Sequence, residues 1–264
     1  MENEGIIRLG IFLGLFALLA VLEWVVPKRQ RRAKKTNRWF TNWAIVVLDT
    51  ISLRLVAIIL PLLAVGAALN AQNSGIGLFN TLDWPIWLEW ILVILILDFL
   101  IWGQHVITHK VPILWRLHQV HHADTDMDVT TAIRFHPIEI LFSMAIKIGA
   151  VYALGPDPWA VIVFEILLNG AAMFNHSNIA LPRWLDRLLR LVIVTPDMHL
   201  VHHSDDRREH DTNYGFALSI WDRLFRTYTD APAKGTDGVT IGLQWQDEAP
   251  TRLGWSLALP FRKS

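Results

Sequence analysis

The chain has 264 residues, of which 53% are hydrophobic and only 18% charged, a composition typical of a membrane protein rather than a water-soluble domain. Its 24 basic and 24 acidic residues balance, so no overall field favours a nucleic acid as partner. The sequence contains no cysteine, which excludes disulfides, thiolate metal sites and iron–sulfur clusters and leaves histidine and carboxylate as metal ligands.

The first apolar run covers residues 6–26 and has no charge between Leu9 and Leu22. At about 1.5 Å per residue, a helix of this length spans a hydrocarbon core of about 30 Å. A cleaved secretory signal is the rival interpretation. The acidic start "MENEG" and the lack of a small-residue cleavage site favour a retained membrane anchor.

A basic block follows at residues 27–38, with seven Lys or Arg and no acid in twelve residues. Such a block suits either an anionic partner or the cytoplasmic flank of a membrane helix. Its position between two apolar runs favours the flank, and we place it in the cytoplasm.

Further apolar runs predict the rest of the membrane topology. A second span covers residues 43–69, a polar connection covers 70–83, and a third span covers 85–103. Residues 138–154 and 159–174 form a helical hairpin, because the joining "GPDP" breaks a helix. We therefore predict an all-α integral membrane protein with four to five transmembrane or hairpin helices. This topology carries all eleven histidines to one cytoplasmic, histidine-rich helical cap.

Three charged residues fall inside the predicted spans: Asp49, Arg54 and Asp98. A charge in lipid is costly unless it is paired or faces a cavity. A structural ion pair or a place near the headgroups competes evenly with a functional role. The segment "SGIGLFN" (74–80) lacks the third glycine of a dinucleotide fingerprint and predicts no such site.

The histidines gather in three clusters: "HVITH" from His105, "HQVHH" from His118 and "HLVHH" from His199. Residues three or four apart share one face of a helix, so these imidazoles can converge on common metal ions. A single histidine at a membrane interface is more often a hydrogen-bonding residue, but the repeated spacing argues against that role for the set. The candidate ligands are His105, His109, His118, His121, His122, His199, His202 and His203, with His176 in "FNHSN" as a ninth.

Imidazole-rich, thiolate-free sites suit Fe, Zn, Cu or Ni. Eight or nine nitrogens exceed the four to six that one ion takes, so the clusters predict two metal ions. Two histidines stand apart. We expect His136, which precedes a proline, to have a structural or supporting role, and we leave His210 out of the ligand set.

Five segments resemble the motifs of the fatty acid hydroxylase and sterol desaturase superfamily: "DFLIWGQHVITHKVPILWRLHQVHH", "RFHPIE", "NHSN", "TPDMHLVHH" and "NYGFALSIWDRLFRTY". The match spans roughly residues 90 to 230. The resemblance implies a membrane enzyme in which the nine histidines hold two iron ions on the cytoplasmic side and activate O₂ for lipid hydroxylation or desaturation. Zinc is a substitute expected in purified protein, and no catalytic residue beyond the ligands is assigned.

The chain departs from the family pattern at two positions. Val106 stands where the family often has Arg, and Arg226 stands where it often has Gly. The sequence has no "HPGG" haem-binding motif, so the resemblance implies a separate electron donor of cytochrome b5, ferredoxin or pterin type. We expect membrane anchor helices in residues 1–84, a hydroxylase-like catalytic domain in 85–230 and a packed cytoplasmic tail in 231–264.

The predicted function is a multi-pass membrane oxygenase, in the inner membrane if the source is a bacterium, acting on a fatty acyl, sterol-like or ether lipid drawn from the bilayer. The alternative is a zinc- or copper-binding membrane protein or transporter without oxygen chemistry, which the position of the clusters outside the spans disfavours. Five aspartates flank the clusters. Orientation of a ligand imidazole competes there with helix capping and solvation: Asp124, Asp126, Asp128, Asp197 and Asp211.

Overall fold

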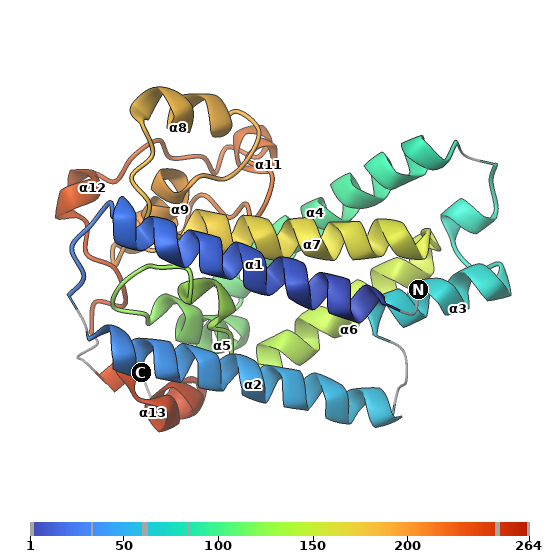
Figure 1. The fold of residues 1–264 in the computed structure, drawn as a ribbon, viewed down its shortest axis with the longest axis horizontal. Coiled ribbons are helices and arrows are strands. Elements are labelled where there is room, and N and C mark those ends of the chain that lie inside the picture. Colours follow the sequence, from blue (N-terminus) through green and yellow to red (C-terminus); the bar gives the residue numbers. More distant parts are fainter. Residues whose placement is uncertain (1–2, 33, 60–62, 84, 246–248, 263–264) are drawn as a thin grey trace.

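Long helices dominate the computed structural model, which describes residues 3–32, 34–59, 63–83, 85–245 and 249–262 (Figure 1). Within these described ranges, five helices are long and apolar enough to cross a membrane. The described residues form no strand beyond three isolated bridges. The protein is therefore all-α and membrane-integral, as predicted, and its five long helices are α1 (Glu4–Val25), α2 (Lys35–Ile59), α4 (Ile86–Lys110), α6 (Pro137–Leu154) and α7 (Pro158–His176).

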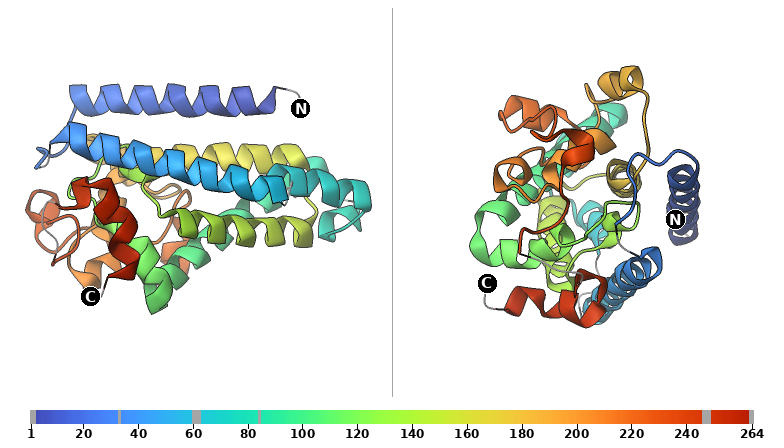
Figure 2. Two further views of the ribbon diagram at one scale, coloured as in Figure 1. Left: turned by 90° about the horizontal axis from the view of Figure 1, so that it is seen from below. Right: turned by 90° about the vertical axis from the view of Figure 1, so that its left-hand side faces the viewer.

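The short helices gather at the two ends of this bundle (Figure 2). Helix α3 (Ala64–Ser74) lies at one end. The opposite end, here called the histidine end, holds α5 (Pro112–His122), α8 (Arg183–Leu189), α9 (Pro196–His202), α10 (Arg207–His210), α11 (Ile220–Leu224), α12 (Gly235–Gly238) and α13 (Leu253–Ala258). Single 3₁₀ turns cover Leu78–Asn80, Thr131–Ile133, Ala249–Thr251 and Leu259–Phe261.

The predicted second span, residues 43–69, is wrong in its bounds. Helix α2 begins eight residues earlier, at Lys35, and ends at Ile59, while residues 64–74 form the separate helix α3. The polar connection predicted for residues 70–83 is correspondingly shorter. The sequence carries Pro61 between the two helices, in a stretch outside the described residues, and proline disrupts the interior of a helix.

Proline sets the start of several helices. Pro112, Pro137, Pro158 and Pro196 occupy first-turn positions of α5, α6, α7 and α9, where a missing N–H costs nothing. The predicted hairpin of α6 and α7 is confirmed, since α6 ends at Leu154 and α7 begins at Pro158.

Two residues shape the turn of that hairpin. Gly155 adopts φ +61°, and a Cβ there would lie 2.2 Å from the carbonyl oxygen of Ile76. Asp157 then caps α7 by accepting hydrogen bonds from the amides of Trp159 and Ala160. The turn thus depends on the lack of room for a side chain at residue 155 and on the cap that Asp157 provides.

Helix α4 continues beyond the predicted end of its span at Gly103 and runs to Lys110. The additional turns carry His105 and His109. Val111 is both the last cap of α4 and the first cap of α5, so the chain turns without a loop between the first and second histidine clusters.

Apolar contacts between helices fix the bundle. Phe16 and Leu19 of α1 pack on Ala172 and Met173 of α7. On another face of α7, residues Ala160 and Phe164 pack on Val93, Leu97 and Ile101 of α4. These contacts hold the histidine-bearing ends of α4 and α7 side by side.

The last segment of the chain contacts the histidine end. Leu243 and Leu259 join Ile45 of α2 and Val120 of α5 in one buried cluster. The buried Arg134 guanidinium donates to the carbonyl oxygen of Pro250 and to Ser256. Arg134 also donates to the carbonyl oxygen of Val120, so these contacts tie Leu243 and residues 250–259 to α5, which carries the second histidine cluster.

The charged residues of the spans have different surroundings. Asp98 is buried and accepts a 2.7 Å hydrogen bond from the indole N–H of Trp221. Arg54 is exposed, and no ion pair joins it to Asp49 among the described residues. Asp49 is buried and faces a cavity.

Candidate metal centre

All nine candidate histidines lie together at the histidine end, and every one is at least 96% buried. Helix α4 supplies two, α5 supplies three, the last residue of α7 supplies His176, and α9 with its C-cap supplies three. Segments separated by up to 98 residues in the sequence thus bring their imidazoles into one volume. The structure divides them into two groups.

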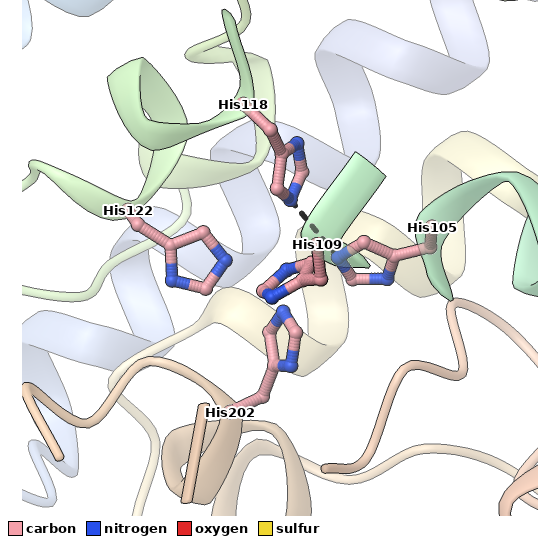
Figure 3. A group of neighbouring side chains, drawn as sticks. All are labelled: His105, His109, His118, His122 and His202. Carbon is pink, nitrogen blue, oxygen red and sulfur yellow. Dashed lines mark hydrogen bonds between the residues drawn. The ribbon is translucent and has the colours of Figure 1, made fainter. Parts of the chain in front are cut away.

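Group one holds five histidines whose donor nitrogens lie within 4.8 Å of one another: His105, His109, His118, His122 and His202. Figure 3 shows their rings pointing toward a common centre. The Nε2 atoms of His105 and His118 are 3.0 Å apart.

Group two holds four histidines with the same limit of 4.8 Å: His121, His176, His199 and His203. His176 lies at their middle. Its Nε2 is 3.1 Å from Nε2 of His121, 3.1 Å from Nε2 of His199 and 3.2 Å from Nε2 of His203.

The hydrogen-bond partners of their Nδ1 atoms assign the tautomers of two imidazoles in group one, His105 and His118. Nδ1 of His105 lies 2.7 Å from the carbonyl oxygen of Tyr214, and Nδ1 of His118 lies 2.6 Å from a Glu139 carboxylate oxygen. Both partners are acceptors, so both Nδ1 atoms carry the proton and both Nε2 atoms carry a lone pair. Two lone pairs that face each other at 3.0 Å repel. They become compatible when a cation lies between them.

Group two shows the same arrangement. Nδ1 of His176 donates to the carbonyl oxygen of Ala172 at 2.7 Å, which leaves its Nε2 as a lone-pair donor toward three other rings. Metal–imidazole bonds are about 2.0 to 2.1 Å long, so nitrogens that bind one ion would lie roughly 3 Å or slightly more apart. The observed separations of 3.0 to 3.2 Å match this geometry.

Imidazole nitrogens without hydrogen-bond partners also indicate metal binding. Eight buried imidazole nitrogens have no hydrogen-bond partner among the described residues, spread over His109, His121, His122, His199, His202 and His203. Buried polar atoms are normally hydrogen-bonded, and each orphan is costly. The donor set, all nitrogen and without thiolate, suits Fe, Zn, Cu or Ni. The residues therefore fit two metal ions.

Burial also keeps the imidazoles in the ligand form. It lowers the pKa of His118 to about 3. The same desolvation holds the pKa values of five further rings well below the usual range: His121, His122, His199, His202 and His203. A neutral imidazole offers a free lone pair at neutral pH.

Glu139 is a site residue that the sequence interpretation missed. Its side chain is 5% exposed, and its carboxylate accepts the Nδ1 proton of His118. A carboxylate in this position fixes the ring and raises its basicity as a ligand. The available signal was "HPIE", in which the acid follows the proline that starts α6.

The flanking aspartates do not share one role. Asp124 and Asp128 bind Arg38 of α2 instead of an imidazole, at 2.5 and 2.8 Å. Asp197 pairs with Lys28 at 3.0 Å. Burial raises the pKa of Asp128, but the Arg38 guanidinium outweighs it and brings the pKa to about 2.

Asp126 and Asp211 complete the set of flanking acids. Asp126 accepts the backbone N–H of Arg32 at 3.0 Å. Asp211 alone approaches a candidate ligand, with its Oδ1 3.4 Å from Nδ1 of His109. Most of these carboxylates thus hold Lys28, Arg32 and Arg38 of the basic block against the histidine end.

The two remaining histidines differ in position. His136 caps α6, since its Nδ1 accepts the amide of Ile138 at 3.2 Å, in agreement with the structural role expected for it. His210 stacks on Trp115 and lies with His109 and Asp211 in a third group of potential ligand atoms. Its exclusion from the ligand set stays a prediction.

Asp222 organises the segment behind His105. Its carboxylate accepts the amides of Tyr214 and Gly215 and the indole N–H of Trp102. This fixes the peptide whose carbonyl oxygen receives the His105 proton. Four residues later Arg226 adopts φ +59°, a left-handed conformation that glycine adopts without strain.

A cavity of about 270 Å³ reaches group one from the membrane-spanning part of the bundle. Its wall contains His105 and His118 together with apolar side chains of all five long helices, including Phe12, Leu53 and Ile101. An elongated apolar molecule in this space would contact the histidines without crossing water.

The sequence pattern of the fatty acid hydroxylase family matches residues 90–227, just over half of the chain, with all nine candidate histidines inside the match. The chain belongs to the fatty acid hydroxylase family. This agrees with the superfamily resemblance inferred from the motifs.

Individual relatives are more distant. The ornithine lipid hydroxylase OlsE of Rhizobium tropici is 27% identical over 88% of this chain and 70% of its own length. The alkylglycerol monooxygenases of Xenopus tropicalis and Homo sapiens are 32% and 31% identical over 60% and 62% of this chain. The chain spans only about a third of those two proteins. No solved structure matches the chain.

Proposed function

We propose that this member of the fatty acid hydroxylase family is a lipid hydroxylase that uses O₂ at a two-iron centre. The observation that carries the proposal is the division of nine buried imidazoles into two groups with opposed lone pairs. The names of its relatives support a lipid as substrate. No catalytic residue beyond the ligands is proposed.

Two iron ions would supply O₂ activation for attack on an unactivated C–H bond. The residues of the chain hold and orient them. Group one (His105, His109, His118, His122 and His202) would bind one ion, and group two (His121, His176, His199 and His203) the other. Glu139 and the carbonyl oxygens of Tyr214 and Ala172 fix the rings that they contact.

The cavity positions the substrate in this proposal. Its wall of apolar side chains ends at His105 and His118, so a lipid chain entering between the helices places a carbon beside group one. Holding the C–H bond near the metal ligands contributes through proximity, and the apolar wall excludes water. Electrons come from a separate donor of cytochrome b5, ferredoxin or pterin type, which approaches from the histidine end.

The orientation of the protein is a further part of the proposal. The basic block, of which the structure describes residues 27–32 and 34–38, lies at the histidine end, which supports a cytoplasmic location for this end. Because the chain has no cysteine, single cysteines at Lys34 and Asp83, at opposite ends, would report the topology cleanly. In intact cells we expect an impermeant maleimide to label Asp83→Cys only. Labelling of Lys34→Cys alone would reverse the orientation.

The division of the chain is also a proposal: anchor helices in 1–84, a catalytic part in 85–230 and a tail in 231–264. The contacts of Leu243 and Leu259 with Val120 support a tail packed on the catalytic part. Co-purification of separately expressed residues 1–230 and 231–264 tests it.

The decisive experiment measures metal and oxygen together. Purified protein should contain about two irons per chain, with zinc as a substitute, and should consume O₂ in the presence of lipid and reductant. Mass spectrometry then separates hydroxylation, which adds one oxygen atom to the lipid, from desaturation, which removes two hydrogens. A single zinc without oxygen consumption would favour the metal-carrier alternative.

Two variants serve as a matched pair for this experiment. His202→Ala removes a candidate ligand and should abolish turnover and lower the metal content while the protein still inserts into membranes. His136→Asn retains the cap of α6 and should keep both. Equal effects of the two changes would contradict the assignment of His202.

A further inference from the structure

One side of the cavity beside group one is polar; this side is here called the polar face. Asp49 of α2, Gln104 of α4 and Glu139 of α6 all line it. The family match begins at residue 90, so Asp49 belongs to the part of the chain outside that match. A residue in this position can distinguish substrates without contributing to the chemistry shared by the family.

Three oxygen atoms of this face lack donors. Oδ1 of Asp49, Oε1 of Gln104 and Oε2 of Glu139 are buried and have no hydrogen-bond partner among the described residues. A buried acceptor without a donor is costly, and an unpaired carboxylate in a membrane more so. None of the three receives a hydrogen bond from a described residue, so each can accept an N–H or O–H group of a molecule in the cavity.

Several neighbouring donors are engaged elsewhere, and the others make no hydrogen bond to Asp49. The hydroxyls of Thr50 and Thr108 donate to the carbonyl oxygens of Val46 and His105 in their own helices. Lys147 also lines the cavity, but its ammonium donates to Glu165 at 2.9 Å. Ser143 and Asn169 line the cavity as well, yet no described residue donates a hydrogen bond to Oδ1 of Asp49.

The charges around the cavity are unequal. Lys147 and Arg8 share the single carboxylate of Glu165, so these three side chains carry one net positive charge. Asp49 and Glu139 are two carboxylates, and only one oxygen of Glu139 is occupied, by His118. The face thus attracts a positive group that carries several hydrogen-bond donors. A protonated primary amine meets both requirements.

We propose that Asp49, assisted by Gln104, binds a protonated amino group of the lipid substrate. The inference rests on the proposed function and deepens it, because it names an amine-bearing lipid as the substrate class. Asp49 is a positioning residue: it holds the amine at one side of the cavity so that a defined carbon lies beside His105 and His118. A neutral lipid would leave the Asp49 carboxylate unpaired.

The test compares three lipids with the wild type, Asp49→Asn and a control. The lipids are ornithine lipid, which has a free amine, its N-acetylated derivative with the same chains, and a neutral 1-alkylglycerol. Asp83→Asn is the matched control, since it makes the same change at an exposed position far from the cavity. Each protein is studied in detergent for thermal unfolding with and without lipid, and in nanodiscs for turnover.

We expect ornithine lipid, but not the N-acetylated lipid, to raise the Tm of the wild type and of Asp83→Asn. Asp49→Asn should lose this rise and should increase KM for ornithine lipid by about 10- to 100-fold, the value of a hydrogen bond to a charged group, with a smaller change in kcat. Without lipid its Tm should equal or exceed that of the wild type, because the change removes a buried carboxyl group whose Oδ1 has no hydrogen-bond partner among the described residues.

The outcomes separate this inference from the proposed function. If ornithine lipid raises the Tm of Asp49→Asn as much as that of the wild type, Asp49 meets only water and the inference is wrong. It is also wrong if the N-acetylated lipid binds equally well, or if Asp49→Asn lowers the lipid-free Tm while lipid binding persists. If amine-selective binding depends on Asp49 but no lipid is oxidised, the inference holds and the proposed function fails.

Discussion

Replacement of Arg38 by alanine should destabilise the histidine end. Arg38 is 1% exposed and binds three partners from the segment that follows the second histidine cluster: the carboxylates of Asp124 and Asp128 and the carbonyl oxygen of Asp126. Among the described residues, alanine would remove the ion-pair partner of Asp124 and leave Asp128 with only Arg31, whose Nε is 3.9 Å away. Asp124 lies two residues after His122, so the loss should reach group one.

The magnitude follows from the burial of all three groups. Breaking a buried ion pair by removing one partner costs about 3 to 5 kcal/mol, because the other charge stays buried. For a chain of this size that corresponds to a fall in Tm of roughly 6 to 20 °C. Burial would raise the pKa of Asp124, and the Arg38 charge more than offsets it and lowers that pKa. The attraction therefore exceeds the desolvation cost.

The assay is thermal unfolding in detergent, combined with metal content. Arg38→Lys should give an intermediate Tm, because lysine keeps the charge but not the planar fork. Adding Asp124→Asn and Asp128→Asn to Arg38→Ala should recover part of the loss, and the coupling can be measured by a mutant cycle. An Arg38→Ala protein with wild-type Tm and full metal content would refute the reasoning.

Three further outcomes are expected. Glu139→Ala should weaken metal binding about 10- to 100-fold in competition with a chelator, whereas Glu139→Gln, whose amide oxygen still accepts the His118 proton, should lose less; equal losses would contradict orientation by this acceptor. Gly155→Ala should lower the free energy of unfolding by more than about 1 kcal/mol, because its φ of +61° and the Ile76 oxygen leave no room, while Gly149→Ala, with open space around it, should be neutral or stabilising. Removal of metal by a chelator should lower Tm and its return should restore it; a Tm independent of metal would argue against the two groups as binding sites.

Most of the correct predictions came from local sequence patterns. Composition and the length of apolar runs predict the membrane class and the hairpin, because both depend on residues that are neighbours in the sequence. The spacing of three and four residues within "HQVHH" fixes which imidazoles share a helix face. The convergence of the three histidine clusters could be predicted only by assuming a membrane topology.

Partners distant in sequence could not be predicted in the same way. Glu139 reaches His118 from another helix, and Arg38 lies 86 residues from Asp124. The aspartates nearest to the second cluster in sequence suggested a role beside its imidazoles, yet the fold turns Asp124 and Asp128 toward α2. The end of α2 was missed because the apolar run continues across Pro61, a signal that the sequence did contain.

The contacts of Arg29 link the order of synthesis to the completion of the site. Its guanidinium donates to the carbonyl oxygens of Thr236 and Val239, 207 and 210 residues later in the chain. At roughly 5 to 20 residues per second, a ribosome needs about 10 to 40 s to connect the two. All five long helices are complete once His176 has been made, whereas the third cluster, from His199 to His203, follows. Insertion into the bilayer can therefore finish before either group has all its imidazoles, so loading of the proposed metal centre would be a late step.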